Sequence, residues 1–213
     1  SKKGYGANVT IPFKELAFNF ANEHDISALE CECANTLMAH NGKIKAFNTD
    51  GEGFLKDLEN KDINLVQKKI LILGAGGSAR SIINSLSKIH IEKIDILSRT
   101  ERRIDQIIDK HKTSSNISHY KKGSKYNIVI NTTPVSLNNN EISFPTDIFD
   151  SSSISYDLFY SKNITSFQTW SKNNGVKETH NGLGMLIEQA ALSYNIWNSF
   201  KPETKGLNKI LGF

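Results

Sequence analysis

KKILILGAGGSARSIINSL, residues Lys68–Leu86, is the most informative stretch of this chain because it predicts a complete strand-turn-helix unit. An apolar strand pattern at Ile70–Leu73 breaks into glycines and then continues as a helix pattern. Gly74, Gly76 and Ala79 fit the G-x-G-x-x-G/A dinucleotide fingerprint in that context. Exposed amides and the positive dipole end at a helix start suit a phosphate. A plain tight turn is the alternative, but the context favours a dinucleotide site.

The end of the next predicted strand indicates which dinucleotide fits. A site for NAD usually places an acidic residue about 20 residues after the glycines, to bind the ribose 2′-OH. Here Ser98 holds that position, followed by Arg99, Arg102 and Arg103. A guanidinium matches a 2′-phosphate, which a carboxylate would repel. A solvated basic helix start is the alternative, but arginines there oppose the helix dipole. We therefore predict NADP.

Composition excludes several classes of protein. The 213 residues suffice for one large or two small domains, and a net charge of +4 does not require a nucleic-acid partner. No apolar run is long enough for a membrane span, and there is no signal-peptide pattern. The C-x-C spacing of Cys31 and Cys33 is poor for a disulfide, and the histidines lack metal-ligand spacing. We expect a cytoplasmic protein with reduced thiols and without a bound metal.

The order of the elements predicts an α/β fold, with a Rossmann-like, doubly wound parallel sheet covered by helices on both faces. Asn41-Gly42 predicts a hairpin turn between the strands Thr36–His40 and Lys43–Phe47. Asn138–Asn140 and Ser151–Ser153 indicate loops. Apolar spacing predicts a helix over Phe13–Glu23, one from Asp50 to Leu58 and one over Gly182–Trp197. Between the last two, strands and helices alternate at Lys69–Leu73, Gly77–Lys88, Lys93–Leu97, Glu101–Lys110, Tyr126–Asn131 and Ile154–Leu158.

Two segments outside the nucleotide motif carry more polar residues than a simple helix start needs. GANVTIPFK places Thr10 and Lys14 at the entry of the first helix, and ANTL with AFNTDGEGF supplies Asn35 and Asp50 before a second. Taken one at a time, a helix cap and a solvated first-turn lysine are sufficient explanations.

Taken together and in order, these motifs resemble the shikimate dehydrogenases. The resemblance covers essentially the whole chain and rests on eight motifs. They are NVTIPFK, ANTL, NTDGEGF, LGAGGSAR, SRTERR, INTTPVS, YDLFY and NGLGMLIEQAA.

The resemblance implies roles for individual residues. Lys14 corresponds to the family's catalytic lysine and Asp50 to its partner aspartate. Positions that contact substrate are Thr10, Asn35, Tyr160 and Gln189. Positions that contact NADP are the glycine loop Gly74, Ala75, Gly76, Gly77, Ser78 and Ala79, the adenosine-phosphate loop Ser98, Arg99, Thr100 and Arg103, and the nicotinamide neighbours Leu158 and Gly182.

The implied reaction is the reversible reduction of 3-dehydroshikimate to shikimate by NADPH in aromatic amino acid (chorismate) biosynthesis. The implied architecture places residues 1–50 in a substrate-binding domain, 51–181 in the NADP domain and 182–213 in helices that return to the substrate domain. The active site would lie in the cleft between the domains of a monomer or homodimer. Small-molecule substrate and cofactor are the expected partners, without nucleic acid or membrane.

The family's substrate domain begins well upstream of NVTIPFK, with a serine pair that holds the substrate carboxylate. The chain is therefore expected to be truncated at its N-terminus. If Ser1 is the true start, we expect cofactor binding without efficient turnover. Two alternatives stay open: a quinate/shikimate dehydrogenase of the same superfamily, with NAD as the alternative cofactor, and a non-catalytic NADP-binding regulatory module.

Overall fold

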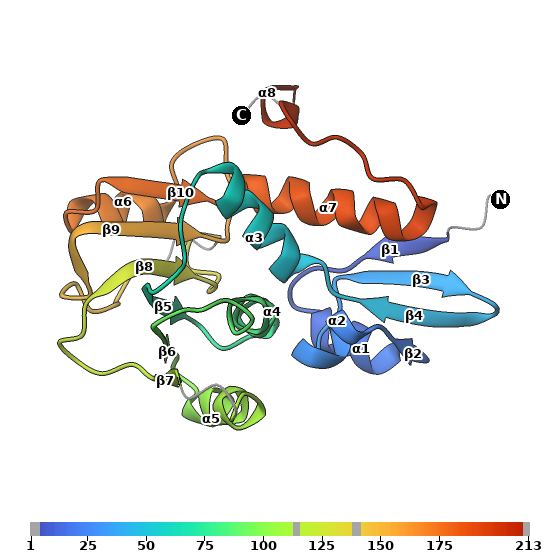
Figure 1. Cartoon of the computed structure of the whole chain (residues 1–213), viewed down its shortest axis with the longest axis horizontal. Helices are drawn as coiled ribbons and strands as arrows, with labels where there is room; N and C mark the ends of the chain where they lie inside the picture. Colours follow the sequence, from blue (N-terminus) through green and yellow to red (C-terminus); the bar gives the residue numbers. More distant parts are fainter. Residues whose placement is uncertain (1–4, 113–115, 138–141, 211–213) are drawn as a thin grey trace.

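The computed structural model describes residues 5–112, 116–137 and 142–210, so the loop expected at Asn138–Asn140 lies outside the described residues. Two separate sheets organise the chain (Figure 1). Six parallel strands form the larger sheet, in the order β10-β9-β8-β5-β6-β7. They are β5 (Lys69–Leu73), β6 (Lys93–Leu97), β7 (Ile117–His119), β8 (Tyr126–Asn131), β9 (Phe149–Asp157) and β10 (Glu178–Asn181).

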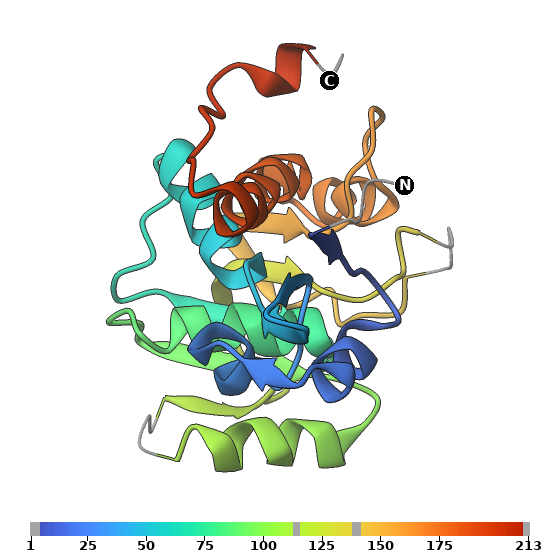
Figure 2. The ribbon, with the colours of Figure 1, turned by 90° about the vertical axis from the view of Figure 1, so that its right-hand side faces the viewer.

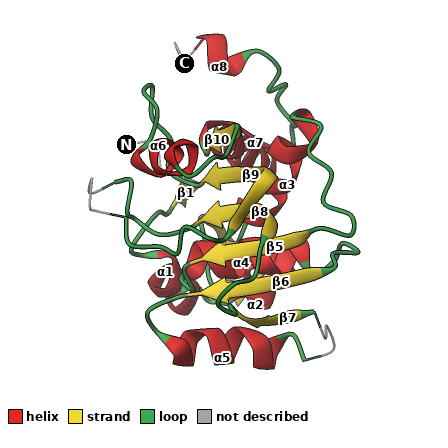
Figure 3. Cartoon of the chain, turned by 90° about the vertical axis from the view of Figure 1, so that its left-hand side faces the viewer, coloured by secondary structure: helices red, strands yellow, loops and turns green. Residues whose placement is uncertain are grey.

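Helices cover both faces of this parallel sheet, as the alternating pattern predicted. In Figure 3 the arrows of β5, β6, β8 and β9 point the same way. Ile70 and Ile72 of β5 pack into a cluster with residues of α3 (Asp50–Asn60), α4 (Gly77–Leu86) and α5 (Glu101–Lys110). On the opposite face, Leu71 and Leu73 pack with Phe167 of α6 (Ser166–Asn173). Burial on both sides explains why β5 reads as a continuous apolar run.

The strand order reverses beside β5. The chain leaves β5 outward to β6 and β7, and then returns to place β8 on the other side of β5. In doubly wound sheets, ligands bind outside the carboxyl ends of the strands at such a switch point. The loop that begins at Gly74 therefore lies at the position where the fold class places its ligand.

The smaller sheet contains the predicted hairpin. Its order is β1-β3-β4-β2, with β3 and β4 antiparallel and Thr36 opposite Phe47. Asn41 and Gly42 both have positive φ, 49° and 75°, as a two-residue hairpin turn requires. Helices α1 (Lys14–Phe20) and α2 (Ile26–Cys31) accompany β1 (Gly6–Asn8), β2 (Glu23–His24), β3 (Thr36–His40) and β4 (Lys43–Phe47).

Two helices connect the sheets. In Figure 1, α3 and α7 (Leu183–Asn198) cross one another between the two sheets, and Figure 2 shows them side by side from the end of the molecule. Gly53 of α3 permits this close approach, because a Cβ there would lie 2.7 Å from the Gln189 backbone nitrogen. Trp197, near the end of α7, donates from Nε1 to the Leu37 carbonyl of β3 at 3.0 Å. The last described helix is the short α8 (Leu207–Ile210).

Three expectations about elements were wrong. The first helix ends at Phe20 and not at Glu23, because Ala21 turns to an extended backbone and Glu23 pairs with β4. That helix buries its small residue Ala17, whereas Leu16 is exposed, so its apolar residues do not form one buried face. Ser151–Ser153 are not a loop, because β9 runs through them with an irregular register against β8.

Several short elements were not predicted at all. The sequence predicted none of the helices α2, α6 and α8 and none of the strands β1, β2, β7 and β10, because such short or polar segments give no clear periodicity.

Candidate active site

Lys14 and Asp50 form a buried ion pair. Lys14 is the first residue of α1 and Asp50 the first of α3, and Lys14 Nζ lies 2.6 Å from Asp50 Oδ2. Only 12% of the lysine side chain and 5% of the aspartate side chain are exposed. A pair so well shielded from solvent is screened little by salt, so its attraction persists at physiological ionic strength.

The other aspartate oxygen belongs to a network of amides and hydroxyls. Asn35 Nδ2 lies 2.9 Å from Asp50 Oδ1, 2.9 Å from Gln189 Oε1 and 2.8 Å from Thr49 Oγ1. Asn35 Oδ1 accepts from the Thr49 backbone N–H at 2.9 Å. The loop before α3 and the middle of α7 are therefore fixed around one buried asparagine.

A hydroxyl of the glycine turn also contacts the lysine. Lys14 Nζ donates to Ser78 Oγ at 3.1 Å, and Ser78 is buried in the first turn of α4. A Cβ added at Gly77 would lie 3.6 Å from Lys14 Cβ. The ion pair and the nucleotide-type turn are therefore parts of one site.

The glycine turn has the features that a phosphate site needs. Gly74 has a φ of +109°, and a Cβ there would lie 2.5 Å from Thr132 Oγ1, so the position requires glycine. Gly76 is the N-cap of α4 without a side-chain cap, and a Cβ there would meet open space. The small Ala79 is fully buried where the helix packs onto the sheet. The amides of this first turn are therefore left to an outside acceptor.

The basic segment after β6 is free to meet an anion. Arg99, Thr100 and Arg103 are exposed, and Ser98 Oγ accepts from the Thr100 backbone N–H at 3.4 Å. Within the described residues, neither Arg99 nor Arg103 forms an ion pair. Guanidinium groups without a protein partner are suited to bind a phosphate.

The remaining expected site residues lie outside the ion-pair network. The Thr10 and Tyr160 side chains are exposed and, among the described contacts, make no hydrogen bond to the network. Leu158 and Gly182 do lie together: a Cβ at Gly182 would be 2.1 Å from the Leu158 carbonyl oxygen, and Gly182 N–H donates to the Phe159 carbonyl at 3.1 Å. They stand where β9 ends and α7 begins.

Other residues of the site were given no role from the sequence. Thr49 Oγ1 donates to the Gln189 carbonyl at 3.0 Å, and its position directly before Asp50 was the available signal. Ser193 Oγ contacts Thr36 Oγ1 at 2.7 Å and accepts from Asn8 Nδ2 at 3.0 Å. Ser193 lies on the helix that returns from the far end of the chain, and local pattern gave no signal for it.

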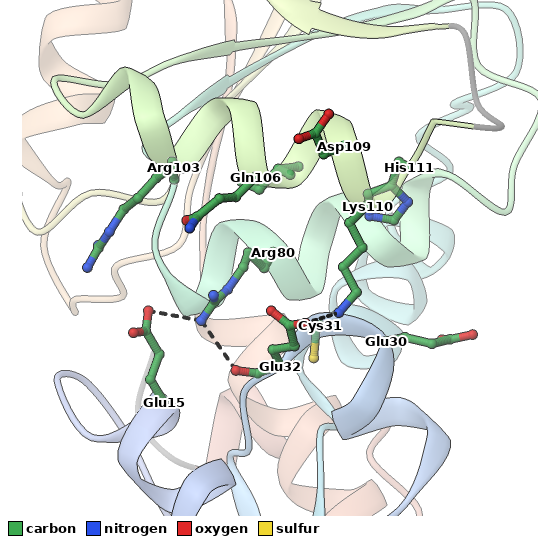
Figure 4. Close-up of a pocket in the computed structure, with 12 residues that line it drawn as sticks. Glu15, Glu30, Cys31, Glu32, Arg80, Arg103, Gln106, Asp109, Lys110 and His111 are labelled. Carbon is green, nitrogen blue, oxygen red and sulfur yellow. Dashed lines mark hydrogen bonds and ion pairs between the residues drawn. The ribbon is translucent and has the colours of Figure 1, made fainter.

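A cavity of about 580 Å³ lies next to this site, between α1 and α2 on one side and α4 and α5 on the other (Figure 4). Ala75 and Arg103 line it, whereas Lys14 and Asp50 do not. Arg80 crosses it with bonds to Glu15 Oε1 at 2.9 Å and to the Glu32 carbonyl at 3.3 Å. The cavity therefore borders the glycine turn and the basic segment.

Two classes of feature are absent from the part of the chain that the structure describes. None of its helices combines the length and apolar character that a membrane crossing requires. Its His, Cys, Asp and Glu side chains do not gather into a group of three that could hold a metal ion.

Two segments of this chain match families of known proteins, and the two families agree with one another. Residues 57–138 match the family described as Shikimate / quinate 5-dehydrogenase. Residues 182–210 match the family described as Shikimate 5'-dehydrogenase C-terminal domain.

Individual relatives agree with the family matches. The shikimate dehydrogenase (NADP(+)) of Shewanella halifaxensis is 36% identical over 211 residues, which are 96% of this chain and 75% of the relative. Among solved structures, an Ael1 enzyme from Pseudomonas putida superposes with a TM-score of 0.88 at 30% identity, over 98% of this chain and 78% of that one. Shikimate 5-dehydrogenase from Thermus thermophilus, in complex with NADP(H) and shikimate, gives 0.85 at 27% identity, with the same coverage. The chain belongs to the shikimate dehydrogenase family.

Proposed function

We propose that this chain is an NADP-dependent shikimate dehydrogenase, which reduces 3-dehydroshikimate reversibly to shikimate. One observation carries the proposal: the buried Lys14–Asp50 ion pair, 2.6 Å long, is joined through Ser78 to the first turn of the nucleotide-type helix. A nucleotide fold alone names no reaction, so the ammonium-carboxylate pair beside it is the informative feature. Membership of the shikimate dehydrogenase family supports the same reaction.

The residues present fit NADP. The uncapped first turn of α4 and the open space at Gly76 suit a pyrophosphate, and the unpaired Arg99 and Arg103 suit a 2′-phosphate. Leu158 and Gly182, at the end of β9, are the proposed neighbours of the nicotinamide. When bound, NADPH supplies a hydride equivalent to a carbonyl carbon.

Lys14 is the proposed source of the proton that must reach the carbonyl oxygen. An ammonium has three N–H donors, of which Asp50 and Ser78 take two. The third is available to a substrate oxygen, where it donates a proton or stabilises negative charge in a site shielded from water. Asp50 fixes the direction of the ammonium through the 2.6 Å ion pair.

Polar side chains around the pair would recognise a ring with several hydroxyls. Asn35 and Gln189 already touch one another near Asp50, and amides can both donate to and accept from a hydroxyl. Thr10 and Tyr160 are exposed, so their proposed contacts with substrate require closure of the site.

We also propose the division into residues 1–50, 51–181 and 182–213. The hydrogen bond from Trp197 to Leu37, which ties α7 to the smaller sheet, supports it. A place in chorismate biosynthesis, in the cytoplasm, as a monomer or homodimer, completes the proposal. The free thiols of Cys31 and Cys33 fit a reducing compartment.

Two measurements on the purified chain test this function. The first is binding of NADPH and NADH by fluorescence, with NADPH expected to bind more tightly. The second is NADPH oxidation with 3-dehydroshikimate, and NADP⁺ reduction with shikimate or quinate. Turnover with the shikimate pair supports the proposal, and turnover mainly with quinate and NAD⁺ favours the quinate enzyme. Tight NADPH binding without any turnover favours either a regulatory module or an enzyme that needs the serine pair expected upstream of NVTIPFK.

A further inference from the structure

The two cysteines of the chain lie in contact. Cys31 ends α2 and Cys33 follows after Glu32, whose left-handed backbone (φ 49°) turns the chain between them. Cys33 Sγ donates to Cys31 Sγ at a distance of 3.4 Å, and both thiols are free. Their C-x-C spacing suggested poor bridging geometry, but this turn places the two sulfur atoms side by side.

The pair packs against the first turn of the nucleotide-type helix. The Gly77 carbonyl, 3.2 Å from Cys33 Sγ, is a second acceptor within reach of the single thiol hydrogen, and Cys33 Sγ lies 3.2 Å from Ser81 Oγ. A Cβ added at Gly77 would be 3.5 Å from Cys33 Cβ and 3.6 Å from Lys14 Cβ. The thiols are therefore neighbours of the glycine turn and of Lys14, although the proposed reaction uses neither of them.

The two thiols differ in reactivity and access. The hydrogen bond from Cys33 lowers the pKa of the Cys31 thiol, and the same bond together with burial raises the pKa of the Cys33 thiol. Cys31 also lines the cavity of about 580 Å³, beside the ion pairs that Arg80 forms with Glu15 and Lys110 with Glu32 (Figure 4). Only 2% of Cys31 is exposed, so a small oxidant must pass this wall of the cavity to reach the sulfur that is more readily a thiolate.

We propose that Cys31 and Cys33 are a peroxide-sensitive thiol pair that closes to a reversible disulfide and weakens binding at the glycine turn. In the first step, the Cys31 thiolate attacks hydrogen peroxide, the O–O bond breaks, and a sulfenic acid and hydroxide form. In the second step, the Cys33 sulfur attacks the sulfenic sulfur. The S–S bond forms, the S–O bond breaks, and water leaves with the proton from Cys33. The pair is oxidised by two electrons, and the peroxide is reduced to two waters.

Closing the disulfide changes the contacts of the helix turn. A disulfide needs the sulfur atoms at roughly 2.05 Å, so the two side chains must close from 3.4 Å, and the oxidised Cys33 sulfur has no hydrogen left for the Gly77 carbonyl. Gly77 then loses one of two donors, since Ser81 Oγ also donates to its carbonyl at 3.0 Å. The turn that offers its amides to phosphate therefore becomes less well held. The disulfide is independent of the proposed function, and only its effect on NADP(H) binding depends on that function.

The test compares the chain with Cys31→Ser and Cys33→Ser after treatment with hydrogen peroxide, with folding checked by circular dichroism. The unsubstituted chain should lose both titratable thiols and a mass of two hydrogens, and NADPH binding should weaken several-fold, all reversed by dithiothreitol. Cys33→Ser should stop at a sulfenic acid on Cys31 that dimedone traps, whereas Cys31→Ser should give no such adduct. In both variants NADPH binding should be unchanged by peroxide.

Retention of both thiols, or gain of oxygen atoms without disulfide, would overturn the proposed pair. A disulfide that forms without change in NADPH binding would overturn its effect on the glycine turn. If the untreated chain binds no NADPH, the proposed function fails, and the thiol and mass measurements still decide the disulfide.

Discussion

Lys14 and Ser78, 64 residues apart in the sequence, meet through a 3.1 Å hydrogen bond from Nζ to Oγ. Lys14 begins α1 beside the smaller sheet, and Ser78 lies in the first turn of α4 on the larger one. This bond, together with the ion pair to Asp50, sets the direction in which the ammonium group points. It links the proposed proton donor directly to the turn that is proposed to hold the cofactor.

Ser78→Ala should therefore lower kcat more than it raises KM for NADPH. A hydrogen bond to a charged group contributes about 1.5–3 kcal/mol, so we expect roughly a tenfold to hundredfold loss. Ser78→Thr keeps the hydroxyl and should recover part of the activity. Ser87→Ala, at the other end of the same helix, is the matched control. Equal kcat in Ser78→Ala and Ser87→Ala would remove the serine from the positioning of Lys14.

Arg103→Ala should weaken NADPH binding and leave NADH binding nearly unchanged, since only NADPH carries the 2′-phosphate. Loss of one charge-assisted contact corresponds to about 1.5–3 kcal/mol, or roughly a tenfold to hundredfold higher Kd. Lys122→Ala removes the same charge from an exposed turn and should have little effect on either cofactor. Equal weakening of NADPH and NADH binding would contradict the assignment.

Asp157→Asn should destabilise the fold, because the carboxylate of fully buried Asp157 is surrounded by donors. Its oxygen atoms accept from Ser136 Oγ and Thr165 Oγ1 at 2.6 Å and from Asn131 Nδ2 at 2.9 Å. Although burial raises the pKa of this carboxyl, an amide cannot replace it, since its NH₂ would face a donor. We expect a loss of about 1–3 kcal/mol in urea unfolding. A change below about 0.5 kcal/mol would contradict this reading.

His111 should make stability depend on pH between neutrality and mild acid. Burial lowers the pKa of this imidazole, and Lys110 adds to the effect. The unfolded chain, with an imidazole pKa near about 6.5, then binds more protons than the folded chain. The neutral His111 imidazole therefore contributes to the free energy of unfolding above about pH 6.5. This contribution is lost as the pH falls toward the lower pKa of the folded state. Urea unfolding at neutral pH and near pH 5.5 should show a smaller difference in His111→Gln than in the unsubstituted chain. An equal difference would exclude His111 as the cause.

Local signals in the sequence were sufficient for the elements that local geometry determines. The glycine turn at Gly74 and the hairpin at Asn41-Gly42 follow from backbone requirements that a few adjacent residues satisfy. β10 and α6 were missed because their polar residues form no clear apolar period. The exposed Leu16 shows that helical spacing identifies a helix without identifying which of its residues become buried.

In the site, too, some features could be predicted from the sequence and others could not. The resemblance pointed to Lys14 and Asp50 as a pair, and the structure places them 2.6 Å apart. The contact of Ser78 with Lys14 and that of Cys31 with Cys33 depend on how α1, α2 and α4 pack, which no local pattern encodes. Thr10 and Tyr160 have no partner in the network, so their role stays a prediction.

The most direct test of the account is the turnover of Lys14→Ala with NADPH and 3-dehydroshikimate, measured beside its NADPH affinity and that of the unsubstituted chain. We expect NADPH affinity within about twofold and a kcat lower by roughly 10²–10⁴, the range for removal of a general acid. Unchanged turnover in Lys14→Ala would contradict the central claim that this lysine serves the reacting oxygen.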